Sequence, residues 1–326
     1  MGKGISHAQG WGQLVLALKR RRRFPQIGFR PYEGGGIVAR VKRRLIPRAE
    51  KLWLRWYQAV HPKSLIHFPW GDPLVETHKP DRRYVATLHQ PYEKWESGTL
   101  DWCRQVGGIH TLTEREATYL REQVPGIKTR CILHGIDIHF WTPTAVPPPA
   151  DRQRIIFCGR YMRNLPMFFR VIRRIREARP KVEVEMLLHP EFRFPPEMLP
   201  LPAGVKTVGP FSAEGLRDFM RSAWLMFMPY DNVTASNSVC EALACGLPFF
   251  TSRVGGMDSY SQGGMVLFGN NEDDAAFDAV VRCLDDPSWR ADLSMRAREA
   301  AVKHLDWDVI AAQLDSFYAE IFSNPI

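Results

Sequence analysis

Apolar runs alternate with amphipathic patterns along most of this chain. Short apolar runs, bounded by polar or turn-forming residues, predict buried strands at 65–68, 84–88, 155–158, 182–188, 225–229 and 248–251. Helical periodicity, as in residues 167–178, fills the intervals between strands. This alternation predicts an α/β fold with parallel sheets covered by helices on both faces, and ligands are then expected at the carboxyl ends of the strands.

A proline-rich run divides the chain. Residues 142–151 contain four prolines in ten positions, which resist helix and strand alike. The chain has 326 residues and 45% apolar content, enough for two domains that each have their own core. We expect an N-terminal domain at 1–145, a C-terminal domain at 146–305, and a closing helix at 306–326 that crosses back toward the first domain.

Residues 228–256 are the most informative stretch, because a polar loop, a short helix, a buried strand and a glycine turn follow one another. Ser236 suits the N-cap, and Gly246 suits a left-handed stop after the helix. Asn237 and Glu241 lie four residues apart and therefore share one helix face beside the free N–H groups of the first turn. A carboxylate there can hold sugar hydroxyls while the amides hold phosphate. The stretch predicts a nucleotide site.

This stretch resembles the donor-binding signature of GT-B glycosyltransferases, most closely the large retaining family numbered 4, also called group 1. The family carries two glutamates separated by seven residues, and the second aligns with Glu241. Val233 occupies the place of the first glutamate, which usually addresses the transferred sugar. The resemblance implies that Glu241 holds the ribose of the donor and that Ser236, Asn237 and Ser238 contribute to donor binding.

Other segments match the same family in the correct order. Residues 154–160 are similar to the strand and Gly-Arg turn that open its C-terminal domain, which makes Gly159 and Arg160 candidates for the donor diphosphate. The family's following lysine is replaced by Leu165, and Arg163 is the nearest available cation. Residues 205–217 look like the strand and turn that border the nucleobase, with Phe211 placed to pack near the base.

Two segments of the N-terminal half extend the resemblance. Residues 83–91 resemble the strand and loop that face the interdomain cleft, with His89 in the loop, and residues 131–143 resemble the segment before the domain crossover, with Gly135 as a donor-binding candidate. This domain looks reduced. The glycine turn that is usual in this domain has two candidates, residues 10–12 and 33–36, and the sequence does not decide between them. A flexible connection without a binding role is an equally open interpretation of residues 33–36.

The resemblance implies a GT-B fold of two Rossmann-like domains facing across a cleft. It also implies transfer of a sugar, with retention of configuration, from a UDP- or GDP-linked donor to an acceptor hydroxyl of a glycan or lipid-linked acceptor, as in assembly of cell-envelope polysaccharide. Arg160 and Arg163 would stabilise the departing diphosphate, and His89 would approach from the opposite domain. Val233, the missing lysine and the reduced first domain keep open a noncatalytic binding or scaffold protein. A hydrolase or phosphorylase of the same fold is a second rival.

Positive charge is concentrated at one end of the chain. Residues 1–60 contain fourteen Lys and Arg against two Glu, a net charge of +12, so the overall +9 leaves about 9 − 12 = −3 for the rest. Apolar residues interleaved at 37–56 suit a helix that touches anionic lipid, although an ordinary cationic helix face fits equally well. No nucleic-acid reading motif is present, so a nucleic-acid partner is not expected.

Cysteine and histidine spacing gives no metal signature. The six cysteines include no Cys-x-x-Cys pair and are expected as reduced core residues, and the histidines lack a ligand spacing. No cofactor or metal is expected beyond the donor itself, which agrees with GT-B transferases generally using protein cations. No run approaches the roughly 20 apolar residues that span a bilayer, and a secretory signal is not recognised, so the expected location is the cytoplasm, with a possible peripheral position at the membrane.

Overall fold

The computed structural model describes residues 17–18, 52–72 and 74–322 of the chain. Both candidate glycine turns of the first domain, at 10–12 and 33–36, lie outside these residues, as does most of the basic N-terminal region.

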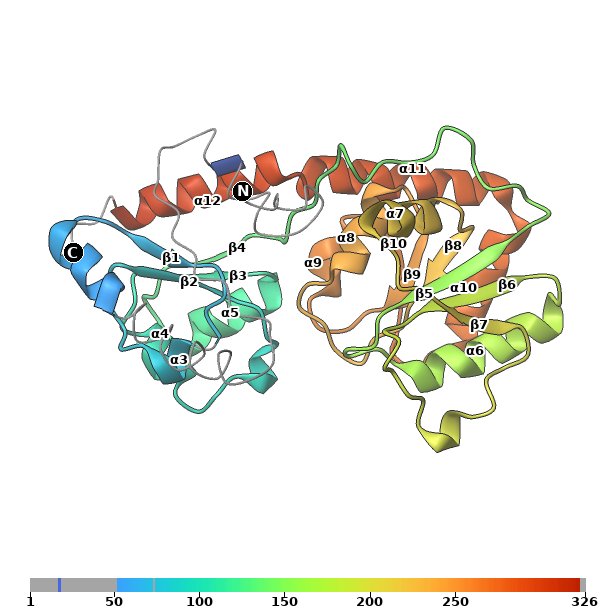
Figure 1. Ribbon diagram of the computed structural model, residues 1–326, viewed down its shortest axis with the longest axis horizontal. Coiled ribbons are helices and arrows are strands. Elements are labelled where there is room, and N and C mark those ends of the chain that lie inside the picture. The colour runs from blue at the N-terminus through green and yellow to red at the C-terminus, as the bar shows by residue number, and fades with distance from the viewer. Residues whose placement is uncertain (1–16, 19–51, 73, 323–326) are drawn as a thin grey trace, which may run out of the picture.

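Two separate parallel sheets form the described fold (Figure 1). The first has the strand order β1-β2-β3-β4, and the second has the order β10-β9-β8-β5-β6-β7. The strands of the first sheet are β1 (Ile66–Phe68), β2 (Tyr84–Leu88), β3 (Gly108–Thr111) and β4 (Thr129–Cys131). Those of the second are β5 (Arg154–Cys158), β6 (Glu183–Leu187), β7 (Val205–Val208), β8 (Leu225–Phe227), β9 (Phe249–Ser252) and β10 (Met265–Phe268).

Helices connect successive strands, as parallel pairing requires. In the first domain they are α3 (Leu74–Thr77), α4 (Thr99–Cys103) and α5 (Glu114–Gln123), with a 3-10 turn η1 (Tyr92–Lys94), and residues 52–60 are also helical. The others are α6 (Leu165–Ala178), α7 (Ala213–Arg221), α8 (Asn237–Ala244), α9 (Met257–Ser261), α10 (Asp273–Asp285), α11 (Pro287–His304) and α12 (Trp307–Phe322), with η2 (Pro196–Met198). Figure 1 shows the second sheet between α6 on one side and α8 and α11 on the other.

The strand positions follow from the apolar runs. Strand β2 is buried at every position, and β5 at four of five, which is the pattern of strands covered on both faces. The two sheets and their helical covers confirm the expected α/β architecture of two Rossmann-like domains. The proline-rich segment 142–151 forms neither helix nor strand.

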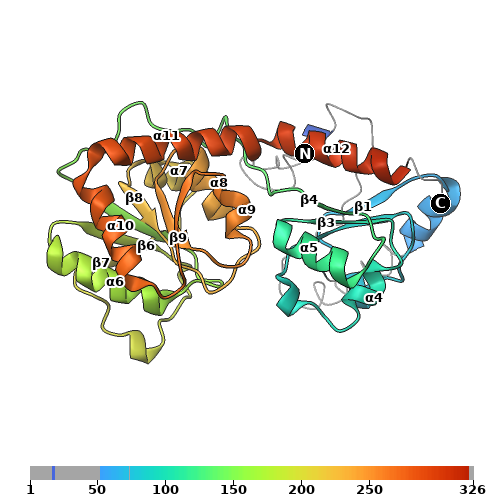
Figure 2. The same ribbon diagram turned by 180° about the vertical axis from the view of Figure 1, so that it is seen from behind.

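The chain passes between the domains twice, and the two passages are bonded to each other. The Ile136 amide donates to the Leu305 carbonyl at 2.7 Å, and Ile136 forms an isolated parallel bridge with Asp306. Beyond this point α12 packs its apolar face on the first sheet, in a cluster that includes Val85, Ile132 and Phe317. Figures 1 and 2 show α11 and α12 running in sequence along one side of both domains.

Candidate functional site

The N-terminus of α8 is open because its N-cap residue bonds elsewhere. Ser236 has the extended backbone of an N-cap, but its side chain does not cap the helix. Its hydroxyl accepts instead from the Tyr230 hydroxyl at 2.9 Å and from an Arg163 Nη at 3.3 Å. The first-turn amides of Asn237 and Ser238 therefore lack a side-chain partner among the described residues and point out of the helix end, where the helix dipole favours an anion.

Glu241 lies one turn further along the same helix. Its residue surface is only 7% exposed, and its carboxylate has no hydrogen bond or ion pair within the described part of the chain. Burial raises its pKa to about 7. Buried polar groups in proteins are nearly always hydrogen-bonded, so a buried carboxylate without a protein partner indicates a ligand that supplies one.

Arg163 is fixed in the turn that follows β5. Its Nε donates to the Cys158 carbonyl at 3.1 Å, one Nη donates to the Tyr161 carbonyl at 2.9 Å, and the guanidinium lies over the Tyr230 ring, 4.0 Å from its centroid. Gly159 has φ +79°, and a Cβ there would lie 3.3 Å from an Arg163 Nη. The glycine thus leaves room for the guanidinium beside Ser236.

Arg160 is presented differently. It is exposed, and its side chain makes no hydrogen bond or ion pair with any other described residue. Leu165, at the place of the family's lysine, is 7% exposed and belongs to the core, so that position offers no cation to a ligand. Arg163 is therefore the cation that the structure holds beside α8, and Arg160 is a second cation whose side chain is unengaged.

His89 is held at the carboxyl end of β2 by Asp72. The backbone amides of His89 and Gln90 donate to the Asp72 carboxylate at 2.9 and 3.0 Å, and His89 Nδ1 lies 3.5 Å from an Asp72 oxygen. Burial acts to raise the pKa of Asp72, but the His89 side chain and these amides outweigh it, and the pKa is lowered. The exposed Trp70 ring stacks on the His89 imidazole with centroids 5.1 Å apart.

Hydrogen bonds across the domain boundary bring these elements together. The Thr234 hydroxyl, three residues before the start of α8, donates to the His89 carbonyl. The Tyr161 hydroxyl, in the turn that carries Arg163, donates to the Gln90 side chain at 3.1 Å. The structure thus places His89, the β5–α6 turn and the N-terminus of α8 at one junction of the carboxyl edges of the two sheets.

Val233 cannot replace a carboxylate at this junction. Its residue surface is 4% exposed, its amide donates to the Asn232 side chain at 2.8 Å, and its carbonyl accepts from the Gly256 amide at 2.7 Å. Across the domain boundary, the Asn232 side chain donates to Glu93 Oε2 at 3.5 Å, and Arg115 forms an ion pair with the Glu93 carboxylate.

Two further candidates have positions with a local packing role. A Cβ on Gly135 would come within 2.4 Å of the Trp307 ring, so packing of the crossover accounts for the glycine. Phe211 follows β7, the edge strand, is 42% exposed and packs on Phe219 with centroids 5.1 Å apart. In the strand order β7 is two places from β5, so Phe211 is further along the sheet than the residues around α8.

Sequence reasoning did not find Asp72, Trp70 or Tyr230. Each acts through a neighbour that is distant in the chain: Asp72 and Trp70 hold His89, and Tyr230 holds Ser236 and Arg163. Tyr230 lies in the resembling stretch and follows a predicted strand, which was the one available signal. Within the described ranges, no group of three or more His, Cys, Asp or Glu is arranged to hold a metal ion, and no helix has the length and apolarity to cross a membrane.

A family model described as "Glycosyl transferases group 1" matches residues 152–286. A D-inositol 3-phosphate glycosyltransferase of Nocardiopsis dassonvillei is 26% identical over 281 residues, which are 76% of this chain and 65% of the relative. The chain thus spans about 65% of the length of this curated relative.

Solved structures of low sequence identity share the fold. A sucrose-phosphate synthase from Thermosynechococcus elongatus has a TM-score of 0.67 and 20% identity, over 83% of this chain and 76% of that one. Anabaena Alr3699/HepE, solved in complex with UDP and glucose, has a TM-score of 0.65 and 16% identity, over 82% of this chain and 81% of that one.

The two parallel sheets, the returning C-terminal helix and the structural likeness define a protein of the GT-B fold. Within it, residues 152–286 match the family model of the group 1 glycosyltransferases.

Proposed function

We propose that this protein transfers a sugar from a nucleotide-diphosphate donor to an acceptor hydroxyl. The observation that carries the proposal is the Glu241 carboxylate, which is buried without a partner among the described residues, one turn from the uncapped start of α8. A nucleotide sugar supplies both partners: hydroxyls of the ribose for the carboxylate, and phosphate oxygens for the amides of Asn237 and Ser238.

The departing diphosphate gains negative charge as the glycosidic bond breaks, so the dominant catalytic contribution is stabilisation of that charge. In the proposed mechanism Arg163, held in place by Ser236 and Tyr230, and the exposed Arg160 provide it together with the helix amides. His89 approaches the sugar or the acceptor from the other domain. The resemblance to a retaining family supports transfer with retention of anomeric configuration.

Nucleotide binding is tested first, by thermal shift of the full chain with UDP, GDP, ADP, TDP and CMP. Ligand at 100 times its dissociation constant adds about 2.7 kcal/mol to the free energy of unfolding, so binding is readily seen. We expect a shift with UDP or GDP that is lost in Glu241→Ala. A shift that persists in the variant would remove Glu241 from the site.

The comparisons suggest the first donors and acceptors to try. A structural neighbour was solved with UDP-glucose, and the curated relative is named for D-inositol 3-phosphate. UDP-glucose and GDP-mannose should therefore be incubated with and without inositol phosphate, glycan and lipid-linked acceptors. A glycosylated product whose anomeric proton matches the donor configuration supports retaining transfer, and release of free sugar without acceptor indicates a hydrolase instead.

Assembly of cell-envelope glycans on the cytoplasmic face of a membrane is the cellular role we propose. The described helix at 52–60 supports contact with lipid, because Leu52, Trp56 and Val60 recur every fourth residue and are 67%, 57% and 53% exposed. Such a row on one helix face suits the interface of an anionic bilayer, next to a strongly basic segment. Cosedimentation with vesicles containing phosphatidylserine, but not with neutral vesicles, is expected, and Trp56→Glu should abolish it.

A noncatalytic protein of the same fold is the alternative. The buried Val233 favours it, since this position cannot supply the carboxylate that the resembling family places beside the transferred sugar. The two readings differ in one result: a binding protein would show the nucleotide shift, and its loss in Glu241→Ala, with no turnover of any donor in the presence of acceptors.

A further inference from the structure

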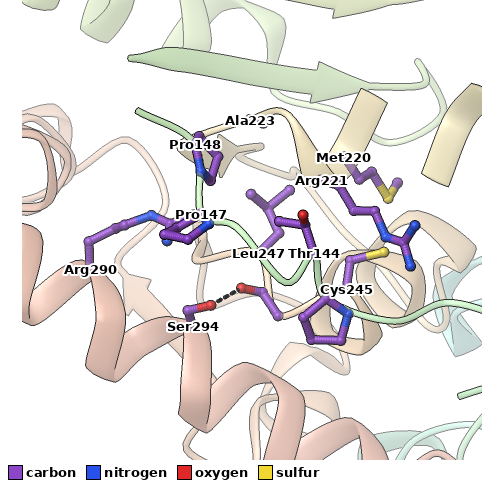
Figure 3. A pocket seen from close by; sticks show the side chains of 12 residues that line it. Thr144, Pro147, Pro148, Met220, Arg221, Ala223, Cys245, Leu247, Arg290 and Ser294 are labelled. Carbon is purple, nitrogen blue, oxygen red and sulfur yellow. Dashed lines mark hydrogen bonds between the residues drawn. The ribbon is translucent and has the colours of Figure 1, made fainter. Parts of the chain in front are cut away.

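A second pocket lies at the opposite edge of the C-terminal sheet, beneath the proline-rich linker (Figure 3). Its walls come from the segments just before β8 and β9, from α11, and from the linker residues Pro143, Thr144, Pro147 and Pro148. Strands β8 and β9 begin at this edge and end at the edge of the α8 N-terminus. The pocket is therefore separated from the proposed nucleotide site by the length of the sheet.

Arg290 is the unusual side chain in this pocket. It is 8% exposed, it lies over the Trp224 ring, and its Nε donates to the Trp224 carbonyl at 3.2 Å. It forms no other hydrogen bond and no ion pair with any described residue. Burial lowers its pKa, with no carboxylate to oppose that effect. Most of its guanidinium donors are thus turned into the pocket without a protein acceptor.

Arg298, on the same helix, is a half-buried arginine with a structural role. Its guanidinium donates to the carbonyls of Ile138, Trp141 and Ala244 at 2.7–3.0 Å. Those bonds satisfy its Nη groups and tie α11 to the crossover segment. Arg290 is more deeply buried than Arg298 but has only one such bond, and buried charges are otherwise paired, so the difference indicates a missing anionic partner.

The surroundings of the pocket favour an anion over any other ligand. Arg221 lines it as well and is anchored by its Nε to the Thr142 carbonyl at 2.6 Å. An outer chamber of about 490 Å³ adjoins it and shares Thr144, Pro147, Pro148 and Arg221 with it, and Arg152 and Arg154 also line this chamber. Asp218, which forms an ion pair with Arg221 at 3.4 Å, is the one carboxylate in the lining of either chamber, both of which consist of described residues.

The volumes of the two chambers limit the kind of ligand that each can hold. The inner pocket has a volume of about 50 Å³, and a water-sized position needs roughly 10–15 Å³, so it holds about four such positions, which matches one tetrahedral oxyanion. The outer chamber falls in the range of roughly 300–1,000 Å³ that takes a small organic molecule. We propose that the inner pocket binds a phosphoryl group, with Arg290 and Arg221 as its cations, and that the outer chamber takes the remainder of a phosphorylated small molecule.

Calorimetric titration of the full chain with inorganic phosphate at constant ionic strength tests this site. Phosphate could also bind beside Arg163, so the titration is done in the Arg163→Ala background, where binding at the pocket should persist. In this Arg163→Ala background, the additional substitution Arg290→Met, which keeps the packing on Trp224, should weaken phosphate binding at least tenfold. Arg221→Gln should weaken phosphate binding as well. Arg282→Gln, which removes an arginine stacked on Trp289 outside the pocket lining, is the matched control and should change nothing.

Absence of phosphate binding in Arg163→Ala, or equal binding in Arg290→Met and its control, would overturn the proposal. Should Arg290→Met fail to fold, as judged by circular dichroism, the single Arg221→Gln substitution decides the same question. The result is independent of transfer activity, because the nucleotide shift through Glu241 is measured separately.

Discussion

An Arg163 Nη donates to the Ser236 hydroxyl at 3.3 Å, which ties the turn after β5 to the start of α8. The bond occupies the side chain that would otherwise cap the helix, and it places a cation beside the uncapped amides. The two parts of the proposed diphosphate site are thus held together before any ligand arrives, which lowers the cost of ordering them on binding.

We expect alanine substitutions at Arg160 and Arg163 to have different effects on activity and stability. Arg160→Ala should raise the activation barrier for transfer by about 2–4 kcal/mol, or roughly 30- to 1,000-fold in kcat/KM, because a charge donor to the leaving group is lost. Its urea midpoint should not move, since the side chain is exposed and unbonded. Arg163→Ala should lower both activity and stability, because its three hydrogen bonds are part of the fold. Full transfer by Arg160→Ala would remove it from the site.

Glu241 should make the free protein less stable as pH rises. Its folded-state pKa is about 7 against an ordinary 4.5, so between these values the unfolded chain gives up a proton that the folded chain keeps. The penalty is absent below pH 4.5, grows up to pH 7 and reaches at most about 3 kcal/mol above it. Glu241→Gln should therefore be more stable than the wild type at pH 8 in urea unfolding, while nucleotide binding weakens. Glu122→Gln, at an exposed position, is the control, and equal stability of Glu241→Gln and wild type at pH 8 would contradict the assignment.

Three histidines predict loss of stability in mild acid. Burial lowers the pKa of His67 and His110 to about 3 and that of His134 to about 4, below the ordinary 6.5. As pH falls below 6.5, the unfolded chain binds three protons that the folded chain does not bind. The free energy of unfolding should therefore drop by up to about 4 kcal/mol at pH 5.5. Urea unfolding at pH 7 and 5.5 measures this. His139→Asn, at an exposed position, should leave the difference unchanged.

The crossover should not tolerate a side chain at Gly135. An added Cβ would lie 2.4 Å from the Trp307 ring, so Gly135→Ala should cost roughly 1–3 kcal/mol through overpacking. Gly98→Ala, where the nearest atom would lie 3.6 Å from the added Cβ, should cost only a few tenths of a kcal/mol. Thermal unfolding of the two variants measures the contrast, and equal melting temperatures would mean that the α12 packing adjusts freely.

Asp72 is expected to act through His89. In Asp72→Asn the charge that strengthens three contacts is lost, and hydrogen bonds to charged groups contribute about 1.5–3 kcal/mol. We expect a lower melting temperature and a fall in kcat, with KM for the donor nearly unchanged, because the proposed donor contacts lie on the other domain. A variant that retained full kcat would show that the position of His89 is not important for turnover.

The strands and helix α8 were accessible from the sequence because their signals are local. Strand β2 occupies the predicted 84–88, α8 begins directly after Ser236, and Gly246 has the expected left-handed backbone with φ +64°. Strands β3, β4 and β10 were not among the predicted runs. Strand β4 in particular, Thr129–Cys131, is short, contains a charged residue and is only half buried, so it lacks an apolar run.

The supporting contacts of the site were beyond sequence reasoning, because they depend on partners brought together by tertiary structure. Ser236 reads as a helix cap, and nothing local indicates that Tyr230 and Arg163 use its hydroxyl instead. Asp72 precedes His89 by 17 residues and meets it only because β1 and β2 are neighbours in the sheet. The lone bond of Arg290 is likewise visible only once Trp224 and the linker are in place.

The return of α12 to the first sheet reverses the order in which the domains can be completed. Val85 and Ile132 pack against Ile310, Leu314 and Phe317. These three residues follow Ile132 by about 180 positions in the chain and follow Val85 by more, so they are translated later. Domains generally fold as the ribosome releases them, at about 5–20 residues per second. The N-terminal domain therefore exposes an apolar surface for many seconds after it leaves the ribosome, and the C-terminal domain can complete its folding first.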